Sequence, residues 1–540
     1  MSLSSAASRI RRGYERSAEA LESGIKVVER RYTPLGRFSP GPFEGWNFLW
    51  QPALVGFVAL SAILAGNLFS NSPFKLEHPG TWFFGVPTQP HRPGSPVNET
   101  TLMLSIVLTF GGLVLLMRVW LRLAEVMKHH PGSPLKSLRW ILGLWSIPMI
   151  VAPPLFSRDV FSYAAQGEMV SHNLSPYIYG PWTLGGGPFV NPVDPLWWNA
   201  PAPYGPAFLW TDGALVKVTG HRDLAAVVAL RFLEVAAVIL LAWAVPMLAR
   251  AVKRDPGEAF VLGVLNPLVL LTLIGGAHND ALMIAFLVTG IGFAARKRPV
   301  IGLFFVAVAT AVKAPAALGL VYIAWTWPGI GPKLKEKVRP MVLAAVVAAV
   351  VLGAFTYLAG FGFGWVRNLT SNGTVRSWAA PATGLGMALA GLAHVLGSHV
   401  ATATMISVTR VVGFLAAAAT SLWLLFNADR FGWIRSLAIS LLLIVILGPV
   451  VQPWYLVWGI ALLAVVYVGR EHFWLLLLSV MTPWMGLPGG RELLDGMIHA
   501  NPAAMFATVL VLGGVLLVPM GNWTQWSWPE VSVEAESLAD

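Results

Sequence analysis

Apolar segments of about 17–25 residues recur along nearly the whole chain, and this is the length that an α-helix needs to cross a lipid bilayer. The composition agrees with this reading. Hydrophobic residues make up 56% of the 540 positions and charged residues only 12%, whereas soluble proteins carry about 25% charged residues. The sequence therefore predicts an all-α, polytopic integral membrane protein.

Apolar length predicts about 14 transmembrane helices, with boundaries that are soft by several residues. The predicted spans are residues 49–68, 101–120, 138–154, 223–249, 258–276, 279–295, 299–313, 315–327, 340–360, 402–426, 436–450, 454–469, 472–486 and 501–519.

Short clusters of Lys and Arg orient these spans, because cytoplasmic loops of membrane proteins are enriched in both residues. With both termini in the cytoplasm, nearly all the basic clusters fall on one side, among them 250–257 and 296–298. This topology requires that 383–399 forms a re-entrant or peripheral helix on the outer side. If that segment spans instead, Arg430 and Arg435 lie outside, against the rule. The sequence predicts a multi-pass plasma-membrane protein, and the net charge of +11 indicates cytoplasmic loops rather than nucleic-acid binding.

Three parts are predicted along the chain. Residues 1–48 form a basic, partly helical segment that lies on anionic lipid of the inner leaflet, or else a disordered cytoplasmic tail. Residues 49–520 form the transmembrane domain, and 521–540 form a short acidic tail. No cleavable signal peptide is expected. The chain has no cysteine, which excludes disulfides and zinc-thiolate sites.

Long loops are predicted on the outer, periplasmic side at 69–100, 155–222 and 361–401. A loop as long as the second needs structure of its own. Its pattern predicts a helix over 159–172, an irregular stretch over 173–205 rich in Pro, Gly and Trp, and a second amphipathic helix over 206–220.

Charged residues at the end of a span are costly and indicate a functional site. Arg158 and Asp159 lie at the outer end of the third predicted span. Asp159, with Ser157, either caps the following helix or acts as a general base. Ser162 and Gln166 share a helix face with Asp159.

Further polar residues lie at outer span ends. His278, Asn279 and Asp280 either cap the helix that they begin or bind phosphate or sugar hydroxyls, and one His with one Asp is too few for a metal site. Lys313 either extends to the lipid headgroups or binds a phosphate. Arg376 lies in the third outer loop, where a guanidinium suits a fixed phosphate. A site on this face cannot use cytosolic nucleotides directly, so an enzyme there needs an activated substrate carried by lipid.

Four motifs carry a resemblance to a known family: "SRDVFSYAAQG" (157–167), "NLSPYIYGP" (173–181), "APYGPAFLW" (202–210) and "GGAHNDALMIAF" (275–286). In these motifs the chain resembles the polyprenol-phosphate-mannose-dependent α-(1→6)-mannosyltransferases of mycobacteria and corynebacteria. They are integral membrane enzymes of the GT-C superfamily that build the mannan backbone of lipomannan and lipoarabinomannan. The resemblance covers roughly residues 45–520. It does not separate members that start the backbone from members that extend it.

The resemblance implies a GT-C fold for residues 49–520 and an inverting transfer of mannose from polyprenyl-phosphate mannose to O6 of an α-mannoside on the outer face. It assigns Asp159 as the catalytic base. Relatives often carry paired acids where this chain has Arg158–Asp159, and a single carboxylate suits a reaction without a metal or other cofactor. The expected partners are the donor, a lipid-linked mannan acceptor and membrane lipids.

The expected donor phosphate and sugar contacts come from Arg158, His278, Asn279, Asp280, Lys313 and Arg376. Aromatic faces and a few polar groups suit a sugar, although aromatic residues at a membrane interface are often only anchors. The expected acceptor groove is formed by Tyr163, Gln166, Tyr177, Trp197, Trp198, Tyr204, Gln452 and Trp454.

Other functions fit the sequence less well. An enzyme for another polyprenyl-phosphate sugar, such as arabinose, usually carries an additional carbohydrate-binding domain, and the chain has no room for one after residue 520. A lipid or sugar transporter usually shows internal repeats with interrupted helices, and no such pairing is visible here. An accessory subunit has no reason to gather Asp159, His278 and Lys313 on one side.

Overall fold

The structure is a computed structural model that describes residues 50–69, 72, 82, 99–129, 132, 135–329, 333–369 and 375–485. Apart from Trp50, these residues belong to one compact unit, Gln51–Asp540, and Met1–Trp50 form the other unit. The predicted segments 1–48 and 521–540, the span 501–519 and most of the loop 69–100 lie outside the described residues.

Every regular element among the described residues is helical, which confirms the predicted all-α class. The first half contains α2 (Trp50–Leu68), α3 (Glu99–His129), α4 (Leu135–Val151), α5 (Asp159–Ser171), η2 (Pro181–Leu184), η3 (Pro195–Trp197), α6 (Pro206–Val218), α7 (Asp223–Ala251) and α8 (Pro256–Gly263). The second half contains η4 (Val269–Gly275), α9 (Asp280–Ala295), α10 (Pro299–Val312), η5 (Ala314–Ala316), α11 (Ala317–Thr326), α12 (Leu334–Ala359), α13 (Gly364–Arg367), α14 (Pro381–Val395), α15 (Thr402–Phe426), α16 (Ala428–Phe431), α17 (Trp433–Ile446), α18 (Pro453–Val466), α19 (Glu471–Met481) and η7 (Thr482–Trp484).

Proline starts several of these helices. Pro206, Pro299 and Pro453 occupy the first turn of α6, α10 and α18. The ring fixes φ near a helical value, and the missing N–H has no helical partner at that position anyway. The sequence therefore places the starts of these helices, and the predicted helices at 159–172 and 206–220 are confirmed as α5 and α6.

One predicted span was wrong as a continuous helix. Residues 258–276 divide into α8 and the π-helix η4. Pro267 cannot donate a backbone hydrogen bond, and the Asn266 side chain takes over local bonding, since its Oδ1 accepts from the N–H of Leu268 at 3.0 Å. Its Nδ2 also donates to Ser479 Oγ at 2.7 Å.

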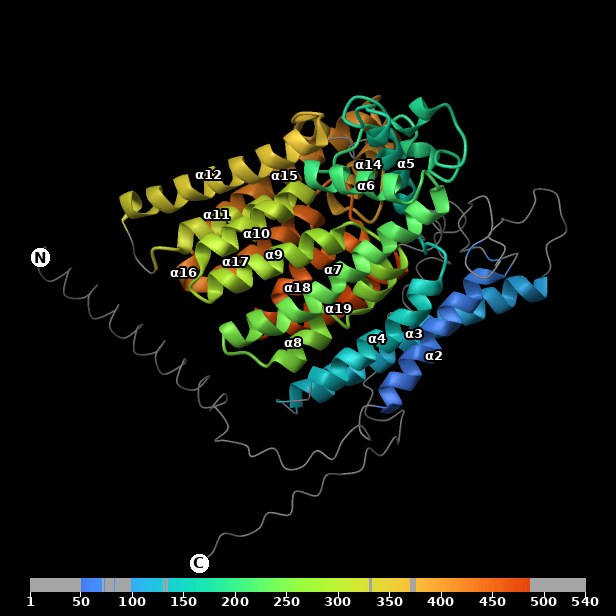
Figure 1. The fold of residues 1–540 in the computed structure, drawn as a ribbon, viewed down its shortest axis with the longest axis horizontal. Coiled ribbons are helices and arrows are strands. Elements are labelled where there is room, and N and C mark those ends of the chain that lie inside the picture. The colour runs from blue at the N-terminus through green and yellow to red at the C-terminus, as the bar shows by residue number, and fades with distance from the viewer. Residues whose placement is uncertain are drawn as a thin grey trace, which may run out of the picture. The chain divides into compact units, whose positions relative to one another are not determined.

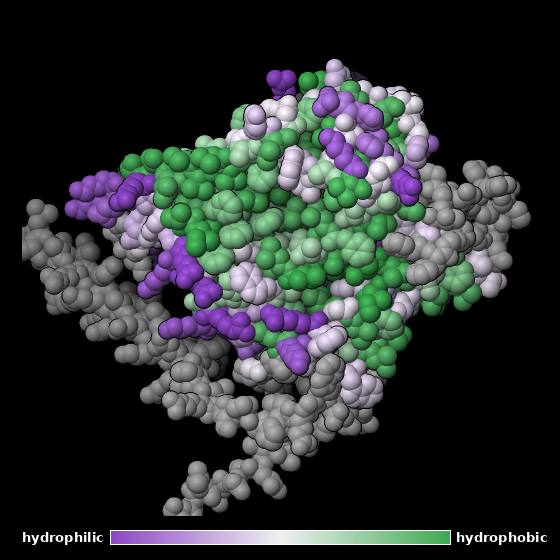
Figure 2. Space-filling view, in the orientation of Figure 1, coloured by the Kyte–Doolittle hydropathy of each residue, from purple (hydrophilic) through white to green (hydrophobic). Residues whose placement is uncertain are grey.

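Membrane character is borne out by length and composition. Helices α2, α3, α7, α12 and α15 are each long and apolar enough to cross a bilayer, and η4 with α9, bent by 117°, forms a broken span or a re-entrant loop. Figure 2 shows a broad hydrophobic surface over the middle of the helices, with hydrophilic residues gathered toward their ends. These findings agree with a polytopic membrane protein; the count of about 14 spans and the periplasmic position of the loops stay predictions.

The helices around α9 position the candidate site. Helix α9 packs against α7 and α10, and α18 packs against α8, α9 and α17. The pair α5 and α6 lies at one end of these helices, and α16 lies toward the other (Figure 1). Helix α9 begins at Asp280 and is followed by the basic triplet Arg296, Lys297 and Arg298. A helix of its length is about 24 Å long, so the triplet lies far from the α9 N-terminus.

Candidate active site

A tight turn of the backbone precedes α5 and places Asp159 at the first position of the helix. Phe156 has a φ of 62°, and the N–H of Ser157 donates to the carbonyl of Leu155 at 2.8 Å. Such a tight turn is strained for a non-glycine residue and is characteristic of functional sites. Ser157 Oγ then accepts from the N–H of Asp159 at 3.2 Å. Ser157 therefore supports the start of the helix, whose N-cap residue, Arg158, makes no capping hydrogen bond with its side chain.

A second strained turn lies between η4 and α9. Ala277 has a φ of 53° and directly precedes His278. A Cβ at Gly276 would lie 2.7 Å from the Thr272 carbonyl oxygen and 2.9 Å from His278 Cδ2, so only glycine fits there without a shift. The N–H of Leu155 donates to the Gly275 carbonyl at 3.0 Å. This bond joins the Asp159 turn to the His278 turn.

Arg231 holds the same two turns together from within α7. Its guanidinium is buried and donates to the carbonyls of Ile150, Ala152 and Gly275. It also lies 5.3 Å from the centre of the Trp82 ring. Arg231 was not predicted as a functional residue from the sequence. A charged residue inside an apolar span is nevertheless a sign of function that the sequence contains.

Asp159, His278 and Trp454 form the first part of the site. His278 Nδ1 lies 3.5 Å from Asp159 Oδ2, at ion-pair distance but without a hydrogen bond. The imidazole is almost fully buried and stacks on Trp454, with ring centres 3.6 Å apart and planes at 16°. The Asp159 side chain is 20% exposed, so one side of the carboxylate is open to a ligand.

Asp280 and Lys313 form the second part. Lys313 Nζ donates to both carboxylate oxygens of Asp280 at 2.9 Å and to Asn279 Oδ1 at 3.3 Å. Trp458 Nε1 donates to Asp280 as well. Asp280 and Asn279 are fully buried. The residues therefore do not act as simple helix caps, and Lys313 points to a buried carboxylate rather than to lipid headgroups.

Aromatic rings surround the Lys313 ammonium. Nζ lies 4.6 Å from the ring centre of Tyr455 and 5.6 Å from the ring centres of Tyr204 and Trp458. Such contacts stabilise a cation that has left water. Gly205 places Tyr204 here, because its N–H donates to the Val312 carbonyl at 2.9 Å and a Cβ would lie 2.2 Å from the Ala311 oxygen.

Tyr163 and Tyr204 link the two parts. Their rings make an edge contact at 5.2 Å. Burial raises the pKa of Tyr163 well above its usual value, and the nearby Tyr204, Asp159 and Asp280 raise it further. Burial and then Asp159 likewise raise the pKa of Tyr204. Both phenols therefore stay protonated at neutral pH beside the carboxylates.

Several other predicted residues lie elsewhere. Tyr177 is buried in an apolar cluster with Leu209 and Trp365. Trp198 is partly buried and donates from Nε1 to the Val193 carbonyl at 3.1 Å.

Trp197, in η3, is partly exposed. Gln166 is buried on α5, with no partner for its Oε1. Gln452 precedes α18 and is partly exposed.

The two predicted arginines differ in position. Arg158 is half-buried and directly precedes α5, next to Asp159. Arg376 is exposed, and the residue before it, Val375, accepts a hydrogen bond from the Arg410 guanidinium. The structure thus brings Arg158 to the site and places Arg376 among the residues around α14 and α15.

Two buried carboxylates near the site were also missed. Glu234, in α7, accepts from the N–H of Leu282 at 3.1 Å. Asp212, in α6, is fully buried, and neither of its carboxylate oxygens has a hydrogen-bond partner. Burial raises the pKa of Asp212 well above its usual value, and the nearby Glu234 adds to the shift. The one sign of these two acids in the sequence is that each interrupts an apolar helix pattern, where a charged residue is unexpected.

Comparison with known proteins identifies the family. The family described as "Alpha-(1->6)-mannopyranosyltransferase, N-terminal domain" matches residues 57–329, and the "MptB C-terminal domain" matches residues 382–517. No solved structure matches the chain, so the GT-C assignment of the fold stays a prediction.

Curated relatives match over most of their lengths. A protein of Mycolicibacterium smegmatis named "Probable alpha-(1->6)-mannopyranosyltransferase" is 34% identical over 67% of this chain and 70% of its own. An alpha-(1->6)-mannopyranosyltransferase of Mycobacterium tuberculosis is 30% identical over 81% and 83%. Alpha-(1->6)-mannopyranosyltransferase B of Corynebacterium glutamicum is 30% identical over 91% and 85%. These matches confirm the resemblance seen in the motifs, and the chain belongs to the family of alpha-(1->6)-mannopyranosyltransferases.

Proposed function

We propose that this protein transfers mannose from polyprenyl-phosphate mannose to O6 of an α-mannoside on the outer face of the plasma membrane. The acceptor is a lipid-linked mannan, and the reaction builds the α-(1→6)-mannan backbone of lipomannan and lipoarabinomannan. The observation that carries the proposal is the convergence of Asp159, His278, Asp280 and Lys313 from three segments of the chain. The family of its relatives, which are named for the same transfer, supports it.

Asp159 serves as the general base. As the acceptor O6 attacks C1 of the donor mannose, the O6 proton moves to the open side of the Asp159 carboxylate. The bond between C1 and the phosphate oxygen breaks on the opposite face, so the configuration at C1 inverts, and polyprenyl phosphate leaves. His278, stacked on Trp454, holds its Nδ1 beside Oδ2 and fixes the carboxylate. A positioned base contributes about 10²–10⁴-fold to rate.

Arg158 is the cation that we assign to the leaving phosphate. Lys313 is already neutralised by Asp280, whose two oxygens it contacts. Arg158 directly precedes the base at the start of α5. A guanidinium there offsets the negative charge that develops on the phosphate oxygen in the transition state.

We propose that the reaction needs no metal ion at these residues. The carboxylate oxygens of Asp280 are occupied by Lys313 and Trp458. Of the two acids Asp159 and Asp280, Asp159 is then the one that is open to the substrates. One base is sufficient for a direct displacement in which the leaving group is a phosphate.

The outer location rests on charge and helix direction. The site lies at the N-terminal end of α9, and the basic triplet 296–298 follows its other end. Basic connections favour the cytoplasmic side. The site then faces the outer side, where a lipid-linked donor is the available form of activated mannose.

The test uses the full-length protein in lipid nanodiscs with a short-chain polyprenyl-phosphate mannose and α-(1→6)-mannobiose. The wild type should form a new α-(1→6) linkage by NMR. Asp159→Asn should lower kcat by about 10²–10⁴-fold. Asp194→Asn is the matched control, since Asp194 lies in the same loop and caps η3.

Two results would overturn parts of the proposal. Turnover of Asp159→Asn within a few-fold of the wild type would remove Asp159 as the base. Faster transfer from polyprenyl-phosphate arabinose than from the mannose donor would assign a different substrate.

A further inference from the structure

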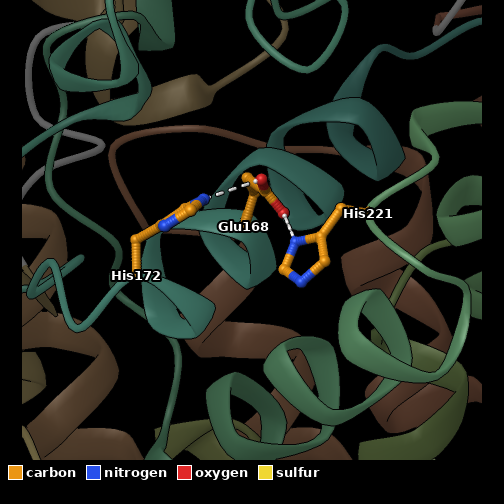
Figure 3. Close-up of side chains that lie close together, drawn as sticks. All are labelled: Glu168, His172 and His221. Atoms are coloured by element: carbon orange, nitrogen blue, oxygen red, sulfur yellow. Dashed lines mark hydrogen bonds and ion pairs between the residues drawn. The ribbon is translucent and has the colours of Figure 1, made fainter.

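A second cluster of ionisable side chains lies at the far end of α5. His172 Nε2 lies 3.0 Å from Oε1 of Glu168, and His221 Nδ1 lies 2.8 Å from Oε2 of the same carboxylate. The three ligand atoms all lie within 4.8 Å of one another. Figure 3 shows both imidazoles directed at Glu168 from opposite sides. Glu168 is about 13 Å along the helix from Asp159, so this cluster is separate from the proposed reaction centre.

The fold brings the three residues together from the end of α5 and from the turn that follows α6. Glu168 and His172 are four residues apart, which places them on one face at the end of α5. His221 follows α6, where Gly220 and His221 have φ values of 66° and 56° and turn the chain back. A Cβ at Gly167 would lie 2.7 Å from the Asp212 carbonyl oxygen, so this glycine permits the close packing of α5 on α6.

We propose that Glu168, His172 and His221 bind a divalent transition-metal ion such as Zn²⁺. Two imidazole nitrogens and one carboxylate oxygen form a ligand set that zinc uses, with a fourth position left for water. Bonds of about 2.0–2.2 Å would place neighbouring ligand atoms of a tetrahedral site about 3.3–3.6 Å apart. The two imidazole nitrogens lie 3.0 and 2.8 Å from different oxygens of Glu168, and the three ligand atoms lie within 4.8 Å of one another, so a rotation of these side chains would bring both nitrogens to one metal ion.

The chemistry of the donors selects the metal class. Imidazole favours Zn²⁺, Co²⁺, Ni²⁺ and Cu²⁺, whereas Ca²⁺ and Mg²⁺ prefer sites made of oxygen alone. A metal ion binds an unprotonated ring nitrogen, so it would replace the hydrogen bonds that the two imidazoles make with Glu168. Ser171 Oγ donates to the Glu168 backbone carbonyl at 2.7 Å and lies 3.5 Å from Oε2 of the same residue.

The consequence of binding is a link between the end of α5 and the turn before α7. Both imidazoles are about half exposed, so the ion can reach the site from solvent. Binding of the ion at this cluster is independent of the proposed transfer reaction. Its measurable effects are the affinity for the metal and a higher stability of the folded protein.

The experiment measures Zn²⁺ binding to the full-length protein by titration calorimetry, in nanodiscs and without a histidine tag. The wild type should bind one equivalent, and Zn²⁺ should raise its Tm. His221→Ala and Glu168→Gln should each weaken binding at least tenfold. His399→Ala is the matched control, because His399 is exposed and outside the cluster. Equal affinity of the wild type and His221→Ala would overturn the proposal.

A second variant gives a positive signal that does not depend on losing a ligand. The chain has no cysteine, so in His221→Cys any thiolate band with Co²⁺ reports this position. We expect a sulfur-to-cobalt charge-transfer band in the near ultraviolet that His172→Ala in the same background removes. A folded His221→Cys variant that binds Co²⁺ without such a band would contradict the site.

Discussion

Asp280 and Lys313 show how the neighbourhood of a residue changes the meaning of its position. In the sequence, each occupies the end of an apolar helix, where a cap or a headgroup contact is the simplest role. In the structure they form a buried pair, with Nζ 2.9 Å from both carboxylate oxygens. Removing one partner of such a pair leaves the other charge buried without compensation. The pair must therefore be kept or lost together.

The coupling of the two buried charges predicts a double-mutant effect. Lys313→Met should destabilise the folded protein by about 3–5 kcal/mol, because it leaves the Asp280 carboxylate unpaired. The double variant Lys313→Met/Asp280→Leu should recover much of that loss. Thermal unfolding of the purified proteins measures both. Lys217→Met, at an exposed lysine near the end of α6, should change little. A double variant no more stable than Lys313→Met would show that the pair is not coupled.

The two predicted arginines should differ in kinetics. Arg158 precedes the base, whereas Arg376 is exposed elsewhere. Arg158→Gln should lower kcat by about tenfold or more, in line with the loss of one charge-stabilising donor in a transition state. Arg376→Gln should leave kcat within about twofold, since it removes no such donor. Steady-state transfer assays compare them. The opposite order would move the phosphate contact to the third outer loop.

The sequence predicted most of the residues at the centre of the candidate site. It did not predict the buried residues around them. Asp159, His278 and Lys313 stood out because polar residues interrupt an apolar pattern at helix ends. Arg231 and Asp212 lie inside helices, and their importance depends on what surrounds them. Arg231 acts through three carbonyls that belong to distant segments. Sequence spacing carries no information on such long-range pairing.

At the scale of elements, helix positions were predictable because apolar runs and prolines mark them. The predicted span 223–249 agrees closely with α7, and 402–426 agrees with α15. The break at Asn266–Pro267 was not predicted, because the residues on both sides are equally apolar. Besides Pro267, the Asn266 side chain holds the break, since its Nδ2 donates locally to the Leu262 carbonyl and over a long range to Ser479 Oγ.

The packing of α5 against α6 leads to a prediction on pH. The usual pKa of an aspartate is about 3.8, and burial raises that of Asp212 well above this value. Between these two values the folded state holds a proton that the unfolded chain has lost. The free energy of unfolding therefore falls as pH rises through this window.

Asp212→Asn removes this titration. The variant and the wild type should have similar Tm values near pH 4, and the variant should have the higher Tm at pH 8. Thermal unfolding across this range measures the difference. Asp223→Asn, at a partly exposed carboxylate that begins α7, is the control. A lower Tm for Asp212→Asn at pH 8 would mean that the carboxylate is ionised and bound to a partner.

At the scale of the whole molecule, the two ends of the helices around α9 carry different groups: the candidate site lies at one end and a basic triplet at the other. Helices α9, α10 and α18 each have one end at the candidate site, where Asp280, Lys313 and Trp454 lie. The basic triplet between α9 and α10 lies at their other end, about 24 Å away for a helix of this length. Composition alone predicts a membrane protein, and only the arrangement of these helices gathers the polar residues at one end.

The absence of cysteine makes this orientation directly measurable, since a single introduced thiol can be labelled alone. Ile178, in the aromatic loop after α5, is 67% exposed, and Lys297 lies in the exposed basic triplet. In intact cells, a membrane-impermeant maleimide should label Ile178→Cys and not Lys297→Cys. After permeabilisation both should react, which controls for accessibility. Labelling of Lys297→Cys in intact cells, with Ile178→Cys protected, would place the candidate site in the cytoplasm and remove the reason for a lipid-linked donor.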